Sequence, residues 1–289
     1  MIQARTLRYN LFVNEIQEKI ILDSLNEDLL PQGDITSVCL VLADQNSTFE
    51  LIVKEDAVLA GLEVFKKAFT LIEKNITIKS GFKDGNEIKK GQLVASIQGN
   101  TLSILKAERT ALNFVSHLSG VATATSCLVK LLKHTKTVLL DTRKTTPNLR
   151  MLEKQAVIAG GGRNHRFNLS ERILIKDNHI DVAGGISKAV HQARKTYGQN
   201  FKIEVEVRNL EELNEAIMSE PDVIMFDNWD LSDLREALKL VPEKILTEAS
   251  GGITIENIKA FAESGVNYIS TGYMIKNAKW VDFSLNAIK

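Results

Sequence analysis

A short stretch of the sequence gathers positive charge around three glycines and the end of an apolar run. The stretch GGGRNHRFNLSERILIKDNHI spans residues 160–180, and its Lys176 directly follows Ile173-Leu174-Ile175. Residues 141–179 hold eight Lys and Arg against four Asp and Glu, although the whole chain has 36 of each. Arginine binds carboxylates and phosphates in a bidentate manner, and lysine supplies a point charge. The pattern predicts a local anion site formed by Arg143, Lys144, Arg163, Arg166 and Lys176.

Lys176 allows two other interpretations. It could form a Schiff base, which requires a lowered pKa that neighbouring cations would favour. It could also be a solvated residue at the end of a strand. The many neighbouring residues suited to binding anions favour a simple electrostatic role.

Three acids are placed where they could act with these cations. Glu204 and Glu206 lie two residues apart in KIEVEV and therefore point to the same side of a strand, and Asp227 ends the run DVIMFD. A buried glutamate needs a cation, a metal or a hydroxyl as partner. Glu206 and Asp227 could hold Mg²⁺ with waters and substrate oxygens, or accept hydrogen bonds from sugar hydroxyls. Structural ion pairs with the cations are an equally open alternative.

Two glycine-bearing loops follow later apolar runs. Ser250-Gly251-Gly252 lies between a predicted strand and a predicted helix, and Thr271-Gly272 follows the next strand. Glycine lets the backbone approach a ligand closely, and the amides at a helix N-terminus favour phosphate. One such loop could be a simple turn, but two together predict a phosphate site. Cations, acids and glycine loops together suit a phosphorylated sugar, with Mg²⁺, and a second polyanionic ligand.

The elements that must position these residues alternate from about residue 137. Strands are expected at 138–141, 173–176, 202–207, 223–227, 245–248 and 268–271, and helices at 149–159, 186–197, 210–218, 231–240 and 255–264. Such alternation indicates a parallel sheet, either an open doubly wound sheet or a barrel. A barrel is favoured because polar residues end nearly every strand, and those ends converge at one mouth. Six strands do not support a full eightfold barrel.

The first hundred residues have a different pattern. A helix is expected at 14–30, followed by strands at 49–54, 76–79 and 93–97 with glycine-bearing turns between them. This pattern is typical of a compact α+β domain.

The composition excludes some classes of function. Equal numbers of acidic and basic residues give no global field for nucleic acid or an acidic membrane. Cys39 and Cys127 match no metal or disulfide spacing, which favours a reducing compartment. Residues 110–129 lack charged side chains but contain many polar ones, which favours a buried helix over a membrane span.

Several motifs in order give the sequence a family resemblance. AERTALNFVSHLSG, DTRKTTPNLR, the 160–180 stretch, EVEV, FDN and EASGGI resemble the quinolinate phosphoribosyltransferase family, also called nicotinate-nucleotide pyrophosphorylase (carboxylating). GDITS at 33–37 and DFSL at 282–285 agree. The resemblance implies an incomplete TIM-like α/β barrel at 114–274, beside an N-terminal α+β (open-faced sandwich) domain at 1–113 that the tail 275–289 rejoins.

The resemblance also implies an activity. Quinolinate and phosphoribosyl pyrophosphate would give nicotinate mononucleotide, pyrophosphate and CO₂ with Mg²⁺, a step of de novo NAD synthesis. It implies a homodimer, with or without further assembly, whose active sites are shared between subunits, and the cysteine pattern adds the expectation of a cytoplasmic location. No nucleic acid and no membrane are expected as partners.

Site residues carry over motif by motif. The resemblance makes Arg109 a cation contributed by the partner subunit, and Lys144, Glu206 and Asp227 the catalytic residues. Glu206 and Asp227 would also face the metal and the ribose. Contacts with the substrates would come from Thr142, Arg143, Lys144, His165, Arg166 and Lys176, and contacts with the 5′-phosphate from Ser250, Gly251, Gly252, Thr271 and Gly272.

Two rival functions remain compatible with the residues. One is a related phosphoribosyltransferase-like protein, such as the paralogue associated with molybdate transport loci. The other is a non-catalytic binder of phosphorylated nucleotides that uses the same pocket.

Overall fold

The chain folds into two compact units. The computed structural model describes the backbone of residues 2–288 and the side chains of residues 15–288. The first unit contains the described residues up to Ala124, together with Thr146–Gly161 and the tail from Ala278. The second contains Thr125–Thr145 and Gly162–Asn277. The domain boundary expected between residues 113 and 114 stays a prediction.

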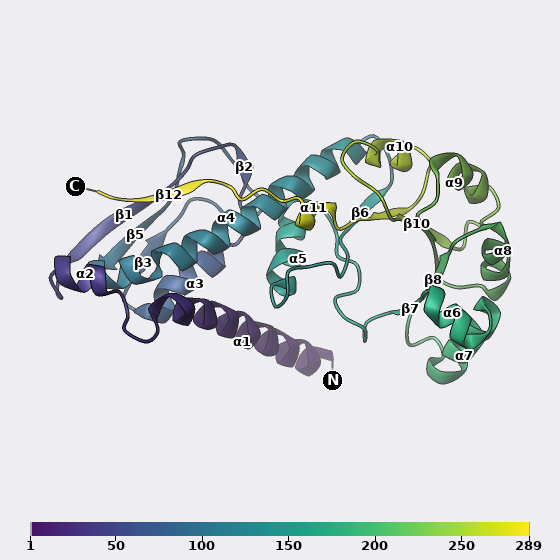
Figure 1. Cartoon of the computed structure of the whole chain (residues 1–289), viewed down its shortest axis with the longest axis horizontal. Helices are drawn as coiled ribbons and strands as arrows, with labels where there is room; N and C mark the ends of the chain where they lie inside the picture. The colour runs from purple at the N-terminus through teal and green to yellow at the C-terminus, as the bar shows by residue number, and fades with distance from the viewer. Residues whose placement is uncertain (1, 289) are drawn as a thin grey trace. The chain divides into compact units, whose positions relative to one another are not determined.

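An antiparallel sheet organises the first unit. Its strand order is β12-β1-β5-β3, with bounds β1 (Asn46–Val53), β3 (Thr77–Lys79), β5 (Leu93–Asn100) and β12 (Phe283–Ala287). Phe49, Leu51 and Val53 of β1 are buried while the residues between them are partly exposed, so only one face of the sheet is covered. Figure 1 shows the yellow C-terminal strand β12 beside the purple strand β1.

Helices cover this sheet and complete an α+β open-faced sandwich. The helices of this unit are α1 (Ile2–Leu29), α2 (Ile35–Leu40), α3 (Leu62–Ile72), the beginning of α4 (Thr101–Leu132) and α5 (Arg150–Ala159), and the short strands β2 (Ala57–Val58) and β4 (Glu87–Ile88) form a separate ladder. Phe65 and Phe69 of α3 pack edge to face with ring centroids 5.0 Å apart. The predicted strands of this unit are present, whereas α2 and α3 were not expected.

The long helix α4 contains the uncharged segment that was expected to be a buried helix. Among the described residues it is the one helix long and apolar enough to cross a membrane, and half of its most apolar window is buried inside the protein. Its hydroxyls bond within the first unit: Ser119 Oγ accepts the N–H of Ala60 at 3.0 Å, and Thr123 Oγ1 accepts that of Val58 at 2.9 Å. These bonds are what a core helix requires of its polar side chains.

A six-stranded parallel sheet forms an incomplete TIM-like α/β barrel in the second unit. The strand order is β6-β11-β10-β9-β8-β7, and the bounds are β6 (Val138–Leu140), β7 (Ile173–Ile175), β8 (Ile203–Val207), β9 (Val223–Asp227), β10 (Leu246–Ser250) and β11 (Tyr268–Ser270). Figure 1 shows these strands curving around with helices outside them: α6 (Asp177–Ala183), α7 (Ile186–Tyr197), α8 (Leu210–Ser219), α9 (Leu231–Leu238), α10 (Ile258–Ala262) and α11 (Tyr273–Lys276).

The strand register brings polar residues to one edge of the barrel. Glu206 of β8 is paired with Met225 of β9, Asp227 with Ser250 of β10, and Ser250 with Ser270 of β11. All residues of β8 are buried. Successive side chains of a strand point to opposite faces, so the valines of β8 point toward the outer helices while Glu204 and Glu206 point into the barrel. The prediction of six parallel strands whose carboxyl ends converge is therefore confirmed.

Candidate active site

A cavity of about 460 Å³ opens at the carboxyl ends of the barrel strands. Its lining comes from five strand ends and the two loops that follow β6 and α5. It brings together eleven residues singled out from the sequence: Thr142, Arg143, Lys144, His165, Arg166, Lys176, Glu206, Asp227, Ser250, Gly251 and Gly252. An adjoining hollow of about 180 Å³ shares Thr142, Lys144 and the glycine loop, and adds Thr271 and Gly272. The expected cation cluster and phosphate loops are thus neighbouring parts of one site.

The three glycines redirect the chain from α5 into the barrel. Gly160 caps α5, and Gly161 has φ +89°, a left-handed conformation that favours glycine. The chain then runs beside β6: Arg163 N–H donates to Leu139 O at 2.9 Å, and Asp141 N–H donates to Arg163 O at 3.0 Å. His165 N–H donates to the buried carboxylate of Asp141 at 2.8 Å. This pairing directs His165 and Arg166 into the cavity, whereas the Arg163 side chain is exposed and outside the lining of both hollows.

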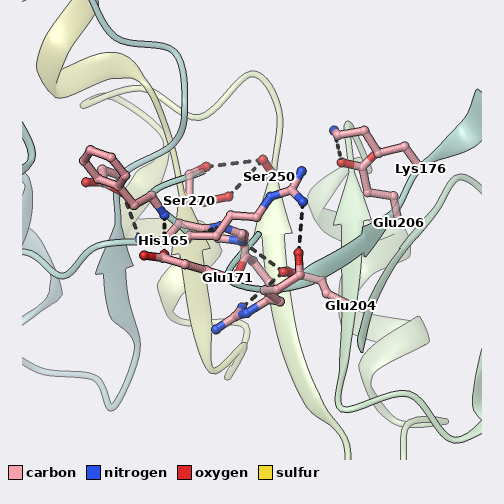
Figure 2. Close-up of polar contacts among 12 residues, drawn as sticks. His165, Glu171, Lys176, Glu204, Glu206, Ser250 and Ser270 are labelled. Atoms are coloured by element: carbon pink, nitrogen blue, oxygen red, sulfur yellow. Dashed lines mark hydrogen bonds and ion pairs between the residues drawn. The ribbon is translucent and has the colours of Figure 1, made fainter. Parts of the chain in front are cut away.

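Lys176 and Glu206 form an ion pair at the barrel mouth. Lys176 Nζ donates to Glu206 Oε1, and Figure 2 shows this contact apart from the neighbouring network around His165. Burial raises the pKa of Glu206, as does the charge of Asp227, against the opposite effect of Lys176. Lys176 is also the N-cap of α6, and its backbone N–H donates to His179 Nδ1 at 3.0 Å.

Asp227 is the second acid of this mouth. Its Oδ2 accepts a hydrogen bond from Asn228 Nδ2 at 2.9 Å, and its charge acts on Glu206. Two carboxylates so close together, beside a cavity, are a suitable set of oxygen ligands for a hard divalent cation such as Mg²⁺. The residues present therefore fit the metal that the sequence resemblance implies.

Arg166 is an unusual cation because it is almost completely buried. Its side chain donates from NH1 to Arg172 O at 3.1 Å, while its Nε has no hydrogen-bond partner in the part of the chain that the structure describes. Burial lowers the pKa of the guanidinium, and so does the charge of Arg143. Two guanidinium groups line one cavity, and one of them is largely removed from water. An anionic ligand would compensate their charge, so this arrangement favours anion binding.

The glycine loops form the wall of the smaller hollow. Gly251 and Gly252 have φ of +86° and +60°. Beside them, Ser270 Oγ donates to Ser250 Oγ at 3.0 Å, and Thr271 Oγ1 donates to Ile253 O at 2.8 Å. A tight wall of small residues and hydroxyls is suited to a phosphate group.

Arg109 does not line either hollow. It is exposed on α4 in the first unit, and every residue lining the two hollows belongs to the second. The functional roles expected for Arg109 and for the cavity residues stay predictions.

Sequence reasoning missed some residues that shape the site. Asn228 supports Asp227, and Arg172 bonds to Glu204 at 3.1 Å. Glu248 is the last residue of the strand expected at 245–248 and was given no role, yet its side chain is fully buried beneath the cavity beside His165. Asn228 could have been found from its place in the FDN motif, whereas the partners of Arg172 and Glu248 depend on tertiary structure.

Two larger hollows on the second unit lack this combination of groups. One, of about 630 Å³, includes Ile245, Thr247 and Asn267 at the amino ends of β10 and β11, the edge that barrel enzymes do not use for chemistry. The other, of about 730 Å³, has Arg208 among the acids Glu211, Asp230, Asp233 and Glu236. The first hollow therefore lies at the wrong edge of the barrel, and the second holds, among the described residues, one cation and no glycine loop.

Comparisons with known proteins cover nearly the whole chain. The family models described as quinolinate phosphoribosyl transferase, N-terminal domain and C-terminal domain, match residues 34–119 and 121–286. A Bacillus subtilis protein named probable nicotinate-nucleotide pyrophosphorylase (carboxylating) is 42% identical over 95% of this chain and 94% of its own length. A Nicotiana tabacum quinolinate phosphoribosyltransferase (decarboxylating) is 36% identical over 91% of this chain and 79% of its own.

Solved structures agree with these matches. The nicotinate-nucleotide pyrophosphorylase from Francisella tularensis has a TM-score of 0.91 at 42% identity, covering 95% of this chain and 97% of that one. A Pyrococcus furiosus structure of the same name, 19% identical with a TM-score of 0.68 over 95% of this chain and 76% of that one, shows that the fold is shared.

Proposed function

This chain belongs to the quinolinate phosphoribosyltransferase family, and from that premise we propose that its barrel cavity transfers phosphoribosyl from phosphoribosyl pyrophosphate to quinolinate. The products are nicotinate mononucleotide, pyrophosphate and CO₂, in the de novo synthesis of NAD. One observation carries the proposal. The cavity of about 460 Å³ that holds the cations and the hollow of about 180 Å³ that holds the glycine loops share Thr142, Lys144 and Ser250–Gly252 in their linings. One hollow suits a dicarboxylate, and the other suits the 5′-phosphate of a sugar.

The reaction needs two anions to be desolvated side by side. Arg143 and Arg166, with Lys176, bind the two adjacent carboxylates of quinolinate, and Arg166 has an Nε–H without a partner among the described residues. Lys144 reaches both hollows, so its ammonium can lie beside the pyrophosphate as that group departs. A chain without net charge thus gathers its positive charge where the ligands require it.

The bond changes follow from the substrates. The ring nitrogen of quinolinate forms a bond to C1 of the ribose as the bond from C1 to pyrophosphate breaks. The transition state resembles an oxocarbenium ion, and the carboxylates of Glu206 and Asp227, which line the cavity, would stabilise its positive charge. The alkylated ring is a pyridinium that holds the electron pair left when the carboxylate next to the nitrogen leaves as CO₂. That carbon then takes up a proton.

Glu206 and Asp227 would hold Mg²⁺, which would neutralise charge on the pyrophosphate leaving group. The Lys176 contact keeps Glu206 oriented toward the mouth, and Asn228 does the same for Asp227.

A homodimer with shared active sites is part of the proposal. The region of α2 exposes four large apolar side chains, those of Ile35, Val38, Leu40 and Leu42, each at least 63% exposed. Apolar surface gathered in this way is typical of a protein interface. The exposed Arg109 would then reach the cavity of the partner subunit. The free cysteines Cys39 and Cys127 are compatible with the reducing cytoplasm as the site of the reaction.

The test is release of labelled CO₂ from quinolinate that carries the label in the carboxylate next to the nitrogen. Quinolinate, phosphoribosyl pyrophosphate and Mg²⁺ are omitted in turn, and release is expected only when all three are present. Binding of nicotinate mononucleotide that raises the Tm without any CO₂ release would instead support a non-catalytic binder. Failure to bind quinolinate would favour the related transferase with another acceptor.

A further inference from the structure

A buried cluster of two glutamates and a histidine lies beneath the substrate cavity. His165 Nε2 is 3.0 Å from Glu204 Oε2 and 3.7 Å from Glu248 Oε1, and both glutamate side chains are fully buried. Arg172 NH1 donates to Glu204 Oε2 at 3.1 Å. Figure 2 shows His165 and Glu204 directed toward one another, apart from the Lys176–Glu206 pair. The proposed reaction leaves Glu204 and Glu248 without a role.

The hydrogen bonds of His165 fix where its ring proton lies. Its Nδ1 accepts the backbone N–H of Arg166 at 2.7 Å, so Nδ1 keeps its lone pair. The ring proton is therefore on Nε2, which donates it to Glu204. Although one donor atom from each of His165, Glu204 and Glu248 lies within 4.8 Å of the others, Nε2 has no lone pair for a metal ion. The cluster in this geometry is not a metal site.

The two glutamates have too few hydrogen-bond donors. Glu204 Oε1 and both carboxylate oxygens of Glu248 have no hydrogen-bond partner among the residues that the structure describes. The Ser270 hydroxyl lies near Glu248 and would lower its pKa by donating to it, but its hydrogen is directed to Ser250 Oγ at 3.0 Å. Arg172 compensates the charge of Glu204, and a second buried carboxylate would lack a counter-charge of its own. One proton on Glu248 would supply a donor to Glu204 Oε1 and remove the excess charge.

We propose that Glu248 is a positioning residue that remains protonated and donates a hydrogen bond to Glu204, thereby holding His165 and Arg172 in place for substrate binding. The effect reaches the cavity through Arg166. The backbone of Arg166 donates to His165 Nδ1, and its guanidinium donates to Arg172 O, so both ends of this cation depend on partners of Glu204. The role in substrate binding rests on the proposed function, whereas the protonation of Glu248 does not.

The surroundings of Glu248 agree with a protonated acid. Burial raises its pKa well above the usual value for glutamate, and the charge of Glu204 adds to this effect. The charged and titratable groups around it are Glu204 on β8, Tyr268 in register on β11, and His165 and Arg172 from the loop before β7, with Asp141 after β6 behind His165. Met225, in register on β9, is uncharged.

The test compares Glu248→Gln with the wild type in thermal unfolding between about pH 6 and about pH 9. A folded-state pKa raised above the unfolded value means that wild-type stability falls as pH rises toward the folded pKa. Glutamine keeps a donor to Glu204 but cannot ionise. The Tm of Glu248→Gln minus that of the wild type should therefore increase with pH. The same difference for Glu243→Gln, an exposed glutamate before β10, should stay constant.

Steady-state kinetics complete the test. Glu248→Gln should keep the wild-type KM for quinolinate, while Glu248→Ala, which lacks the donor, should raise it about tenfold with a smaller change in kcat. A Tm difference that is independent of pH would overturn the protonated state. Equal damage by Gln and Ala at neutral pH would overturn the positioning role. If the wild type does not turn over quinolinate, the proposed function fails, and the unfolding comparison still decides the protonation of Glu248.

Discussion

Gly251 and Asn228 approach so closely that no side chain can stand between them. A Cβ atom built on Gly251 would lie 2.2 Å from Asn228 Oδ1 and 2.8 Å from its backbone nitrogen. Gly251 is also left-handed, with φ +86°. The contact links the expected phosphate loop after β10 to the residue that holds Asp227 after β9.

Gly251→Ala should therefore damage both parts of the site. The added methyl group must displace Asn228 and, with it, the support of Asp227, so we expect kcat/KM for phosphoribosyl pyrophosphate to fall about 100-fold. Gly265→Ala is the matched control, because Gly265 is also left-handed but lines neither hollow of the site, and a Cβ atom added to it would meet nothing within 4 Å. It should carry only the conformational cost, about 1 kcal/mol. Equal losses in the two variants would show that contact with Asn228 is unimportant.

Lys176 should act by its charge and not as a covalent nucleophile. Its amine contacts the Glu206 carboxylate at the mouth of a cavity that also holds Arg143 and Arg166. Lys176→Met should lower kcat/KM about 100-fold or more, and Lys176→Arg, which keeps the charge, should retain clearly more activity. Borohydride added during turnover should leave the mass of the wild-type protein unchanged. A reduced adduct on Lys176 would establish the Schiff base instead.

The sequence predicts this barrel well because its signals are local. The strands β6, β7 and β9 are short apolar runs, and the run in β8 is interrupted only by Glu204 and Glu206, which point inward. The short helix α6 was missed because Asp177-Asn178-His179 shows no apolar period, so Lys176 was placed at the end of a strand and not at the N-cap of a helix.

Pairing between distant residues could not be predicted in the same way. Glu204 and Glu206 lie on the same side of one strand, yet one bonds to His165 and Arg172 and the other to Lys176. The two glutamates have different partners because they lie at different depths below the mouth of the barrel. That depth depends on the tilt and register of the strands. Arg163 was grouped with the cations, but its backbone pairs with β6 and its side chain is exposed. The sequence shows which side chains are charged. The direction in which a side chain points depends on the strand with which its backbone pairs, and the sequence does not show that pairing.

Arg109 provides a test of sharing between subunits. If it acts on the cavity of the partner subunit, Arg109→Ala and Lys176→Ala homodimers should each be nearly inactive. Mixed dimers then contain one cavity with both residues intact, so up to about a quarter of wild-type activity should return after subunit exchange. Exchange is followed with two differently tagged chains. A mixture that exchanges but stays inactive would show that Arg109 does not act in trans.

Asp222 should stabilise the barrel in a pH-dependent manner. It lies just before β9, at the end opposite the cavity, and accepts hydrogen bonds from Ile203 N–H and Arg194 at 2.8 Å and from Lys202 at 2.6 Å. Burial alone would raise the pKa of Asp222, but these hydrogen bonds together lower it. A lowered pKa contributes stability that is present above the unfolded value and is lost as pH falls through the folded value.

Asp222→Asn should therefore cost about 2 kcal/mol of unfolding free energy at neutral pH, because two charge-assisted hydrogen bonds are lost. The cost should shrink below about pH 4, where the carboxylate of the unfolded wild-type chain begins to take up a proton while the folded one stays ionised. Urea unfolding at the two pH values measures it, with Asp230→Asn as control, since Asp230 caps α9 without a side-chain hydrogen bond. Quinolinate turnover at low temperature should not change. An equal cost at both pH values would mean that Asp222 stabilises the fold by shape alone and not by its charge.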